Sequence, residues 1–165
     1  MAQLLLKGKP IHTAGTVPGV HKKAPPFKLI DKDLKERSLQ EFQGKKKLIT
    51  TVPSLDTGTC STMTKRFNQW AQKHPEWVIL VVSADLPFAQ NRFCETEQVH
   101  NVVTLSTLRH QEFGKDYGIL IQDGPIAGLL ARAVFVLDEK DQIVYVEVVA
   151  EITQEPDYNK AMAAL

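Results

Sequence analysis

The sequence predicts an α/β fold, and three stretches carry that prediction. WVILVVS, Trp77–Ser83, is nearly all apolar, as a central strand covered on both faces is. A helical stripe of apolar residues precedes it, formed by Met63, Phe67, Trp70 and Ala71. Two further apolar runs, Ala133–Leu137 and Ile143–Val149, flank DEKDQ, which predicts a hairpin. Apolar residues are 43% and charged residues 24% of the 165, as in soluble globular proteins.

The N-terminal third predicts short strands. Leu4–Leu6 and Ile11–Thr13 flank a Lys-Gly-Lys-Pro turn and form an expected hairpin. Phe27–Ile30 is the next candidate strand. In SLQEF, Ser38 with Glu41 three residues on is a possible capping box for one helical turn. Lys47–Val52 then reads as a strand leading to the helix described above.

The C-terminal half continues the pattern. Val102–Leu105 is a further candidate strand and Glu112–Tyr117 a short helix. PFAQNRFCETEQ mixes polar and apolar residues, which suggests a marginal helix. EPDYNKAMAAL predicts a terminal helix, with Pro156 suited to its first turn.

This order of elements is the thioredoxin-like arrangement. A β-α-β start is followed by a hairpin and a terminal helix, so we expect a central mixed β-sheet flanked by helices, with an extra N-terminal β-hairpin. No repeat, linker or low-complexity segment interrupts residues 1–165, which we expect to form a single domain.

Charge and length exclude several function classes. The net charge of +1 gives no basic field to attract nucleic acid or a membrane surface. The lysine cluster Lys45–Lys47 lacks a Gly-rich P-loop around it, so we expect a solvated turn there. The N-terminal run of three leucines is too short for a signal-peptide core, and no stretch approaches the ~20 apolar residues of a membrane span. We therefore expect a cytoplasmic protein, and the five histidines show no metal-ligand spacing.

Cys60 stands at the predicted start of the helix, in TVPSLDTGTCSTM. A free cysteine is only about 3% thiolate at pH 7, and making most of it anionic requires roughly 3.4 kcal/mol of preferential stabilisation. A helix N-terminus supplies about 0.3–1 kcal/mol, up to ~2 in favourable geometry. A nucleophilic Cys60 therefore needs a fixed cation and hydrogen-bond donors as well.

Three other residues are candidates for that environment. Thr57 lies one turn before Cys60, so its hydroxyl can come beside the sulfur, and Pro53 can cover the site and ends the strand. Arg132 opens an apolar strand, where a long charged side chain needs a partner, and is the best candidate for the cation. An ordinary alternative stays open, in which Cys60 is a small buried residue, Thr57 a helix cap and Arg132 a surface ion pair.

Beyond this local reading, the chain resembles a known family. PSLDTGTC fits the peroxiredoxin pattern P-x-x-x-T-x-x-C through Pro53, Thr57 and Cys60, and SADLPFAQNRFC closely resembles the segment with the second cysteine of bacterial thiol peroxidases. Three more segments are similar to that branch, the atypical two-cysteine peroxiredoxins: VVTLSTLR, DGPIAGLLARAVFVLDEKDQIV and VAEITQEPDYNKAMAAL. The similarity runs from about Leu6 to the C-terminus.

The resemblance implies a role for each matched residue. Cys60 would be the peroxidatic cysteine, Cys94 the resolving cysteine, and Arg132 the arginine that completes the site; Pro53 and Thr57 would shield and orient it. It implies reduction of hydrogen peroxide and organic hydroperoxides through a sulfenic acid and a Cys60–Cys94 disulfide, recycled by thioredoxin. It also implies a homodimer, and a reaction that needs no metal, haem or flavin.

Two other functions remain as alternatives. A peroxide-sensing redox relay or binding protein on the same fold would use oxidation of Cys60 to alter a partner surface. A general thiol–disulfide oxidoreductase is disfavoured because Cys60 is followed by Ser-Thr-Met, with no second cysteine two residues further on.

Overall fold

A seven-stranded mixed sheet forms the centre of the computed structural model, which describes all residues from Met1 to Leu165. The three inner strands β5, β6 and β7 run parallel, and the strands beyond them on either side are antiparallel to their neighbours. In spatial order the strands are β10 (Ile143–Val148), β9 (Ala133–Leu137), β5 (Lys47–Thr51), β6 (Val78–Ser83), β7 (Val103–Ser106), β3 (Lys28–Ile30) and β4 (Glu36–Ser38). The predicted thioredoxin-like fold with a mixed sheet is confirmed.

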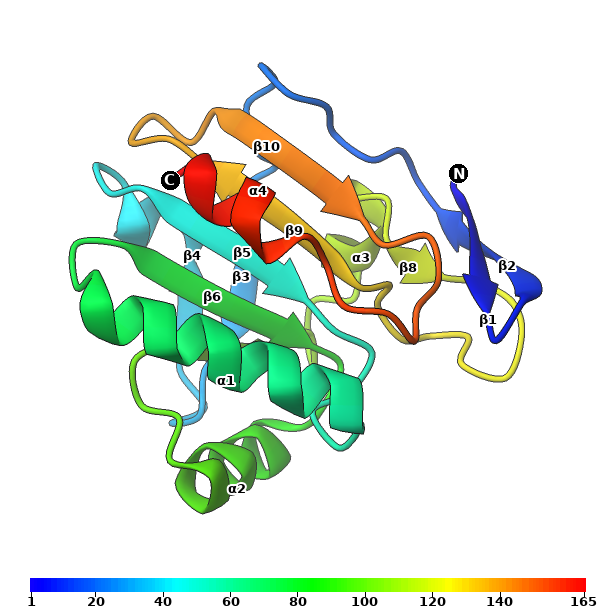
Figure 1. The fold of residues 1–165 in the computed structure, drawn as a ribbon, viewed down its shortest axis with the longest axis horizontal. Coiled ribbons are helices and arrows are strands. Elements are labelled where there is room, and N and C mark those ends of the chain that lie inside the picture. The colour runs from blue at the N-terminus through cyan, green and yellow to red at the C-terminus, as the bar shows by residue number, and fades with distance from the viewer.

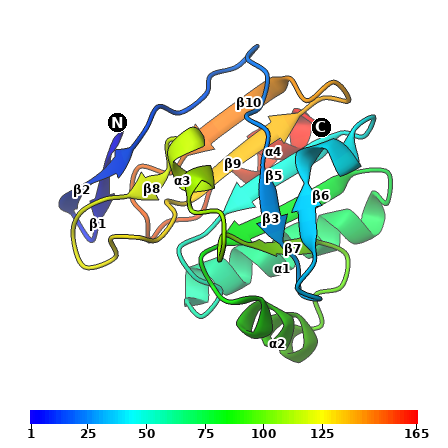
Figure 2. The same cartoon turned by 180° about the vertical axis from the view of Figure 1, so that it is seen from behind.

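Helices cover both faces of this sheet. α1 (Gly58–Lys73) and α4 (Tyr158–Ala163) lie on one face, in front of the sheet in Figure 1, whereas α3 (Glu112–Asp116) lies on the opposite face, seen in Figure 2. α2 (Pro87–Glu97) packs beside β7. No helix is both long and apolar enough to cross a membrane.

The alternation of side chains along β5 divides the core in two. Leu48 packs with Cys60, Met63 and Phe67 under α1, in a cluster of 14 buried residues. Its neighbour Ile49 packs into a cluster of 22 buried residues on the other face. Because successive strand residues point to opposite faces, this central strand is buried on both sides, as its apolar sequence predicts.

The N-terminal hairpin is confirmed as a separate small sheet. β1 (Gln3–Leu6) and β2 (Lys9–Ala14) pair antiparallel, and β2 also pairs with β8 (Leu120–Ile121). Lys7 and Gly8 make the turn with positive φ. β8, like β4, was not predicted from the sequence, because such short strands depend on their partners.

Several helix boundaries differ from expectation. α4 begins at Tyr158 behind Asp157, whose carboxylate accepts the Lys160 N–H, so Pro156 precedes the helix and does not lie in its first turn. The helical turn after Ser38 is a 3₁₀ helix, Leu39–Phe42, and its Glu41 carboxylate accepts the Ser38 N–H as expected.

Lys47 corrects the expectation of a solvated lysine turn. Its side chain is 0% exposed, with Nζ 2.6 Å from the Asp141 carboxylate. Nζ also donates to the carbonyl oxygens of Phe42 and Lys45. The ion pair and these hydrogen bonds compensate the burial of the charge, and Asp141 lies too far along the chain for the pair to be evident in the sequence.

The far end of α1 carries an aromatic stack. His74 stacks on both Trp70 and Trp77, with ring centroids 5.6 Å and 3.9 Å away, and the centroids of the two indoles are 6.4 Å apart. These are the only two tryptophans of the chain.

Candidate active site

Cys60 lies in the first turn of α1, at the end of the loop that follows β5. Thr57 is the N-cap and Gly58 the first helical residue, so Cys60 is the third. Backbone N–H groups in the first turn of a helix have no acceptor within the helix and favour a negative charge. The Cys60 side chain is 0% exposed and packs against Met63 and Leu55.

Arg132 contacts the sulfur of Cys60. The Nη1 atom lies 3.4 Å from the Cys60 Sγ and 3.7 Å from the Met63 Sδ, and Nε donates to the Ile152 carbonyl oxygen at 2.9 Å. The side chain is only 2% exposed, and no carboxylate forms an ion pair with it. A buried guanidinium without a carboxylate is costly, and a thiolate at Cys60 would be its counter-ion.

The N-terminal hairpin forms hydrogen bonds with residues 150–152, the segment whose Ile152 carbonyl accepts from Arg132. The Leu5 N–H donates to the Ala150 carbonyl at 2.7 Å, and Leu5 accepts the Ile152 N–H at 2.9 Å. The Glu151 carboxylate accepts the N–H groups of Lys7 and Gly8, each at 3.0 Å. These hydrogen bonds lower the pKa of Glu151 to about 2, and the bond from Gly8 contributes most.

Pro53 and Thr57 flank the same loop. Pro53 is buried just beyond the end of β5, and its shielding role stays a prediction. Thr57 is exposed, and its hydroxyl donates to the Ser54 carbonyl at 3.1 Å and makes no hydrogen bond with Cys60. The expectation that this hydroxyl lies beside the sulfur is therefore not met in this structure.

Cys94 occupies a different environment on α2. Its side chain is 7% exposed, and its one hydrogen-bonding neighbour is the Thr104 hydroxyl on β7, at 4.0 Å. Burial, as the largest cause, raises the pKa of the Cys94 thiol. A cavity of about 340 Å³ opens beside it, lined also by Asp31, Lys32 and His100 but not by Cys60. Both cysteines are free thiols.

Two hollows flank the start of α1. One, of about 290 Å³, lies between the Cys60 loop and α2, and its apolar lining is Leu55, Ala89 and Phe93. The other, on the side of Thr59, is bordered by Thr153 and Glu155. Cys60 lines neither of them, so the sulfur is screened from both.

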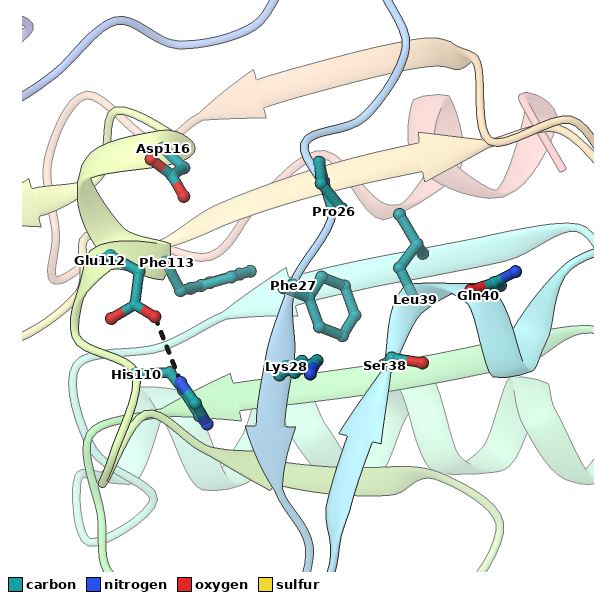
Figure 3. Close-up of a pocket in the computed structure, with 10 residues that line it drawn as sticks. All are labelled: Pro26, Phe27, Lys28, Ser38, Leu39, Gln40, His110, Glu112, Phe113 and Asp116. Atoms are coloured by element: carbon teal, nitrogen blue, oxygen red, sulfur yellow. Dashed lines mark hydrogen bonds and ion pairs between the residues drawn. The ribbon is translucent and has the colours of Figure 1, made fainter.

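A fourth hollow, of about 480 Å³, is lined by neither cysteine (Figure 3). Phe27, Leu39 and Phe113 form its apolar lining, and they belong to the core on the side of the sheet opposite Cys60. His110 at its edge lies 3.1 Å from Glu36 and 3.2 Å from Glu112, and contact with His110 contributes to the lowered pKa of both carboxyl groups. No group of three or more His, Cys, Asp or Glu residues is placed to hold a metal ion.

Sequence reasoning missed the contribution of Ile152. Its role lies in a backbone carbonyl, which residue type does not reveal, and in the pairing of its segment with Leu5.

Fold and site together define a thioredoxin-like protein with a buried cysteine paired to an arginine at a helix start. A family model described as Redoxin matches residues 20–162. The chain is 50% identical to a thiol peroxidase of Leptospira interrogans, covering 99% of this chain and 97% of that one, and 45% identical to a thiol peroxidase of Staphylococcus haemolyticus, covering 99% and 98%.

Solved structures agree with these matches. A peroxiredoxin-like protein from Aquifex aeolicus superposes with a TM-score of 0.92 at 40% identity, covering 99% of this chain and 97% of that one. A thiol peroxidase from Chromobacterium violaceum shares the fold with a TM-score of 0.91 at 24% identity, covering 98% and 93%. The chain belongs to the Redoxin family and, within it, to the bacterial thiol peroxidases. It is therefore an oxidoreductase that reduces peroxides at the expense of thiols.

Proposed function

We propose that this enzyme reduces hydrogen peroxide and organic hydroperoxides with Cys60 as the peroxidatic cysteine, Cys94 as the resolving cysteine and thioredoxin as the reductant. The observation that carries the proposal is the Arg132 guanidinium, buried without a carboxylate and 3.4 Å from the Cys60 sulfur. A cation fixed beside a cysteine sulfur is the kind of environment in which nucleophilic cysteines are found.

In the first step the Cys60 thiolate attacks the terminal oxygen of the hydroperoxide. A sulfur–oxygen bond forms and the oxygen–oxygen bond breaks, so that the sulfur supplies two electrons and becomes a sulfenic acid. The departing alkoxide or hydroxide takes a proton from solvent and leaves as an alcohol or water. Arg132 and the free N–H groups of the first helical turn stabilise the charge that develops on the oxygens, while Pro53 keeps bulk water out. For Thr57 to orient the peroxide, its hydroxyl must first leave the Ser54 carbonyl.

In the second step the Cys94 sulfur attacks the sulfenic sulfur. The hydroxyl of the sulfenic acid leaves and, with the thiol proton, forms water, and a Cys60–Cys94 disulfide results. A disulfide requires Cα atoms roughly 4.4–6.8 Å apart. Cys94 is packed against Thr104 of β7 in the reduced enzyme, so α2 and the first turn of α1 must rearrange between the two steps. Thioredoxin then reduces the disulfide by thiol–disulfide exchange.

Organic hydroperoxides should be the better substrates. Leu55, Ala89 and Phe93 give the hollow beside the Cys60 loop an apolar wall, which favours an alkyl or aryl group over a second hydroxyl. A peroxide bound there reaches the screened sulfur only when the loop moves. The enzyme acts as a cytoplasmic homodimer of single-domain subunits, each spanning residues 1–165, in this proposal.

Thioredoxin-coupled turnover is the decisive experiment. Oxidation of NADPH is followed with thioredoxin, thioredoxin reductase and either cumene hydroperoxide or hydrogen peroxide. We expect turnover with both and a higher kcat/KM for cumene hydroperoxide. Mass spectrometry of the peroxide-treated enzyme should show one Cys60–Cys94 disulfide within a single chain. A chain that is oxidised once but not recycled by thioredoxin would instead favour the peroxide-sensing alternative.

A further inference from the structure

Asp85 lies in the turn between β6 and α2 and holds the loop that leads to Cys60. Its carboxylate accepts the Ser54 hydroxyl at 2.7 Å and the Leu55 N–H at 2.8 Å. Ser54 and Leu55 belong to the segment between Pro53 and the start of α1. The peroxidatic loop is thus fixed to the end of β6 by two charge-assisted hydrogen bonds, which are the stronger kind.

The same carboxylate is connected to α2. It also accepts the Ser83 hydroxyl at 2.7 Å, and Ser83 Oγ in turn accepts an N–H of the Gln90 side chain at 3.0 Å. The second N–H of that amide donates to the Leu105 carbonyl on β7 at 2.9 Å. We call Ser54, Leu55, Ser83, Asp85 and Gln90 the Asp85 network. It forms one continuous chain of hydrogen bonds from the Cys60 loop to the helix that carries Cys94.

Gln90 is an unusual member of this network. Its side chain is 0% exposed, and its amide oxygen Oε1 is buried without any hydrogen-bond partner. An unpaired buried acceptor destabilises the packed state, and unwinding the helix would expose this oxygen to water. Gln90 therefore fixes α2 through its N–H groups while its oxygen lowers the cost of releasing the helix.

We infer that the Asp85 network is a latch that couples the packing of α2 to the position of the Cys60 loop. Asp85, Ser83 and Gln90 are positioning residues, since none of them contacts the Cys60 sulfur. While α2 is packed, the chain of hydrogen bonds keeps the loop and the first turn of α1 in place for attack on the peroxide. When α2 leaves β7, Ser83 loses its bond to Gln90 and the loop loses support at the same time. Coupling of this kind is reciprocal, so loosening the loop must also loosen α2.

The inference rests on the proposed function for its consequence in the reaction. The latch stabilises the reduced, packed state and is absent from the disulfide state. Removing it should therefore favour the disulfide and make it harder to reduce. Its existence, however, can be tested in the reduced protein without any peroxide.

Amide hydrogen exchange in the reduced protein is that test, because the Leu55 N–H is itself bonded to Asp85. Gln90→Met keeps the length of the side chain and removes its polar atoms. We expect the Leu55 amide to exchange about five- to tenfold faster in Gln90→Met, although position 90 lies on another element. In the reverse direction, Ser54→Ala should speed exchange at the Gln90 amide. Asn91→Ala is the matched control, since Asn91 bonds only to Glu95 within the same helix.

If the Leu55 amide exchanges at an unchanged rate in Gln90→Met, the latch is overturned. It is also overturned if Asn91→Ala accelerates Leu55 exchange equally, because α2 would then merely be destabilised. The second readout is the disulfide midpoint potential, which we expect to fall by about 30 mV for a tenfold change in equilibrium. If the wild-type enzyme forms no Cys60–Cys94 disulfide, the proposed function fails, while the exchange data still decide whether the latch exists.

Discussion

The two cysteines of this enzyme are almost equally buried but have opposite surroundings. Cys60 is 0% exposed and lies against a guanidinium in the first turn of a 16-residue helix. Cys94 is 7% exposed and lies near the end of an 11-residue helix, with a threonine hydroxyl as its one hydrogen-bonding neighbour. Burial alone therefore does not decide which cysteine reacts with peroxide.

In the mechanism that we propose, this difference in surroundings gives the two cysteines different roles. At Cys60 a guanidinium lies beside the sulfur in the first turn of a helix, whereas at Cys94 desolvation raises the pKa of the thiol. A resolving cysteine needs no activation before the sulfenic acid exists, since the sulfenic sulfur is already a strong electrophile. It needs only to be delivered by a helix that can move.

Exchanging each cysteine for serine gives the largest expected effect. Cys60→Ser should abolish peroxide consumption, because Cys94, the only other thiol, does not contact a buried cation. Cys94→Ser should still consume about one equivalent of peroxide in a single turnover, but should not be recycled by thioredoxin. Stopped-flow consumption and mass spectrometry of the sulfenic acid measure both. A Cys60→Ser enzyme that still consumes peroxide through Cys94 would reverse our assignment.

Removing the Arg132 guanidinium should greatly slow the reaction of Cys60 with hydroperoxide. We expect Arg132→Met to lower kcat/KM for hydroperoxide by about 10²–10³-fold, the range found on loss of a donor that stabilises developing charge. Arg132→Lys should also be strongly impaired. The planar guanidinium of arginine can donate to the sulfur and to the peroxide oxygen at once, whereas the lysine ammonium is a single point charge.

Arg66→Met is the control for this change. Arg66 is also on α1 but lies over the Tyr158 ring, 4.4 Å from its centroid, and does not contact the sulfur. The kcat/KM of Arg66→Met should stay within about twofold of the wild type, because losing a cation–π contact at a partly exposed site has a small effect. Equal losses in the two variants would mean that general stability, and not the contact with Cys60, sets the rate.

The raised pKa of Cys94 predicts a stability that falls in alkali. The folded state holds the thiol proton more tightly than the unfolded state, so the contribution is complete below the unfolded pKa of about 8.5 and is lost as the pH rises through the folded pKa. Urea unfolding of the reduced protein between neutral pH and alkali should show this loss. Cys94→Ala should remove that part of the pH dependence, and an unchanged slope would argue against burial as its cause.

The smallest effect on activity is expected for Glu151, which acts on the sulfur only through Ile152 and Arg132. Glu151→Gln weakens the bonds to Lys7 and Gly8, and so loosens the segment whose Ile152 carbonyl holds Arg132. We expect a loss of kcat/KM of up to about threefold with little change at Cys94, an exposed hydrogen-bonded carboxylate contributing modestly.

The pH dependence of the same contact has the opposite sign to that of Cys94. With a folded pKa of about 2, the stabilisation by Glu151 is present above the unfolded pKa and is lost as the pH falls toward 2. Acid unfolding of the wild type and of Glu151→Gln should therefore converge at low pH. Curves that stay parallel down to that pH would contradict the role given to this carboxylate.

The elements that could be predicted from sequence are those whose pattern is local. Val78–Ser83 reads as a central strand from its own residues, and the stripe on α1 fixes which face of that helix is buried. β4 and β8 were missed because three and two residues carry no periodicity and form only against their partners.

The site divides in the same way. Cys60 and Arg132 could be proposed because a cysteine at a helix start and an arginine opening an apolar strand are each unusual. The Asp85 network could not, since its members come from the β5–α1 loop, the end of β6 and α2, and only folding brings them together. The orientation of the Thr57 hydroxyl likewise depends on a local choice between the Ser54 carbonyl and the sulfur.

Because Trp70 and Trp77 stack with His74 far from Cys60, the enzyme's tryptophan fluorescence can show how far along α1 a rearrangement at Cys60 extends. Both tryptophans of the chain sit at the C-terminal end of α1, and ten residues of helix separate Cys60 from Trp70, about 15 Å at 1.5 Å per residue. If the rearrangement is confined to α2 and the first turn of α1, these indoles and their imidazole neighbour stay in place, and oxidation is expected to change tryptophan emission little. A clear rise or fall in tryptophan emission on adding peroxide would instead indicate that α1 moves along its whole length.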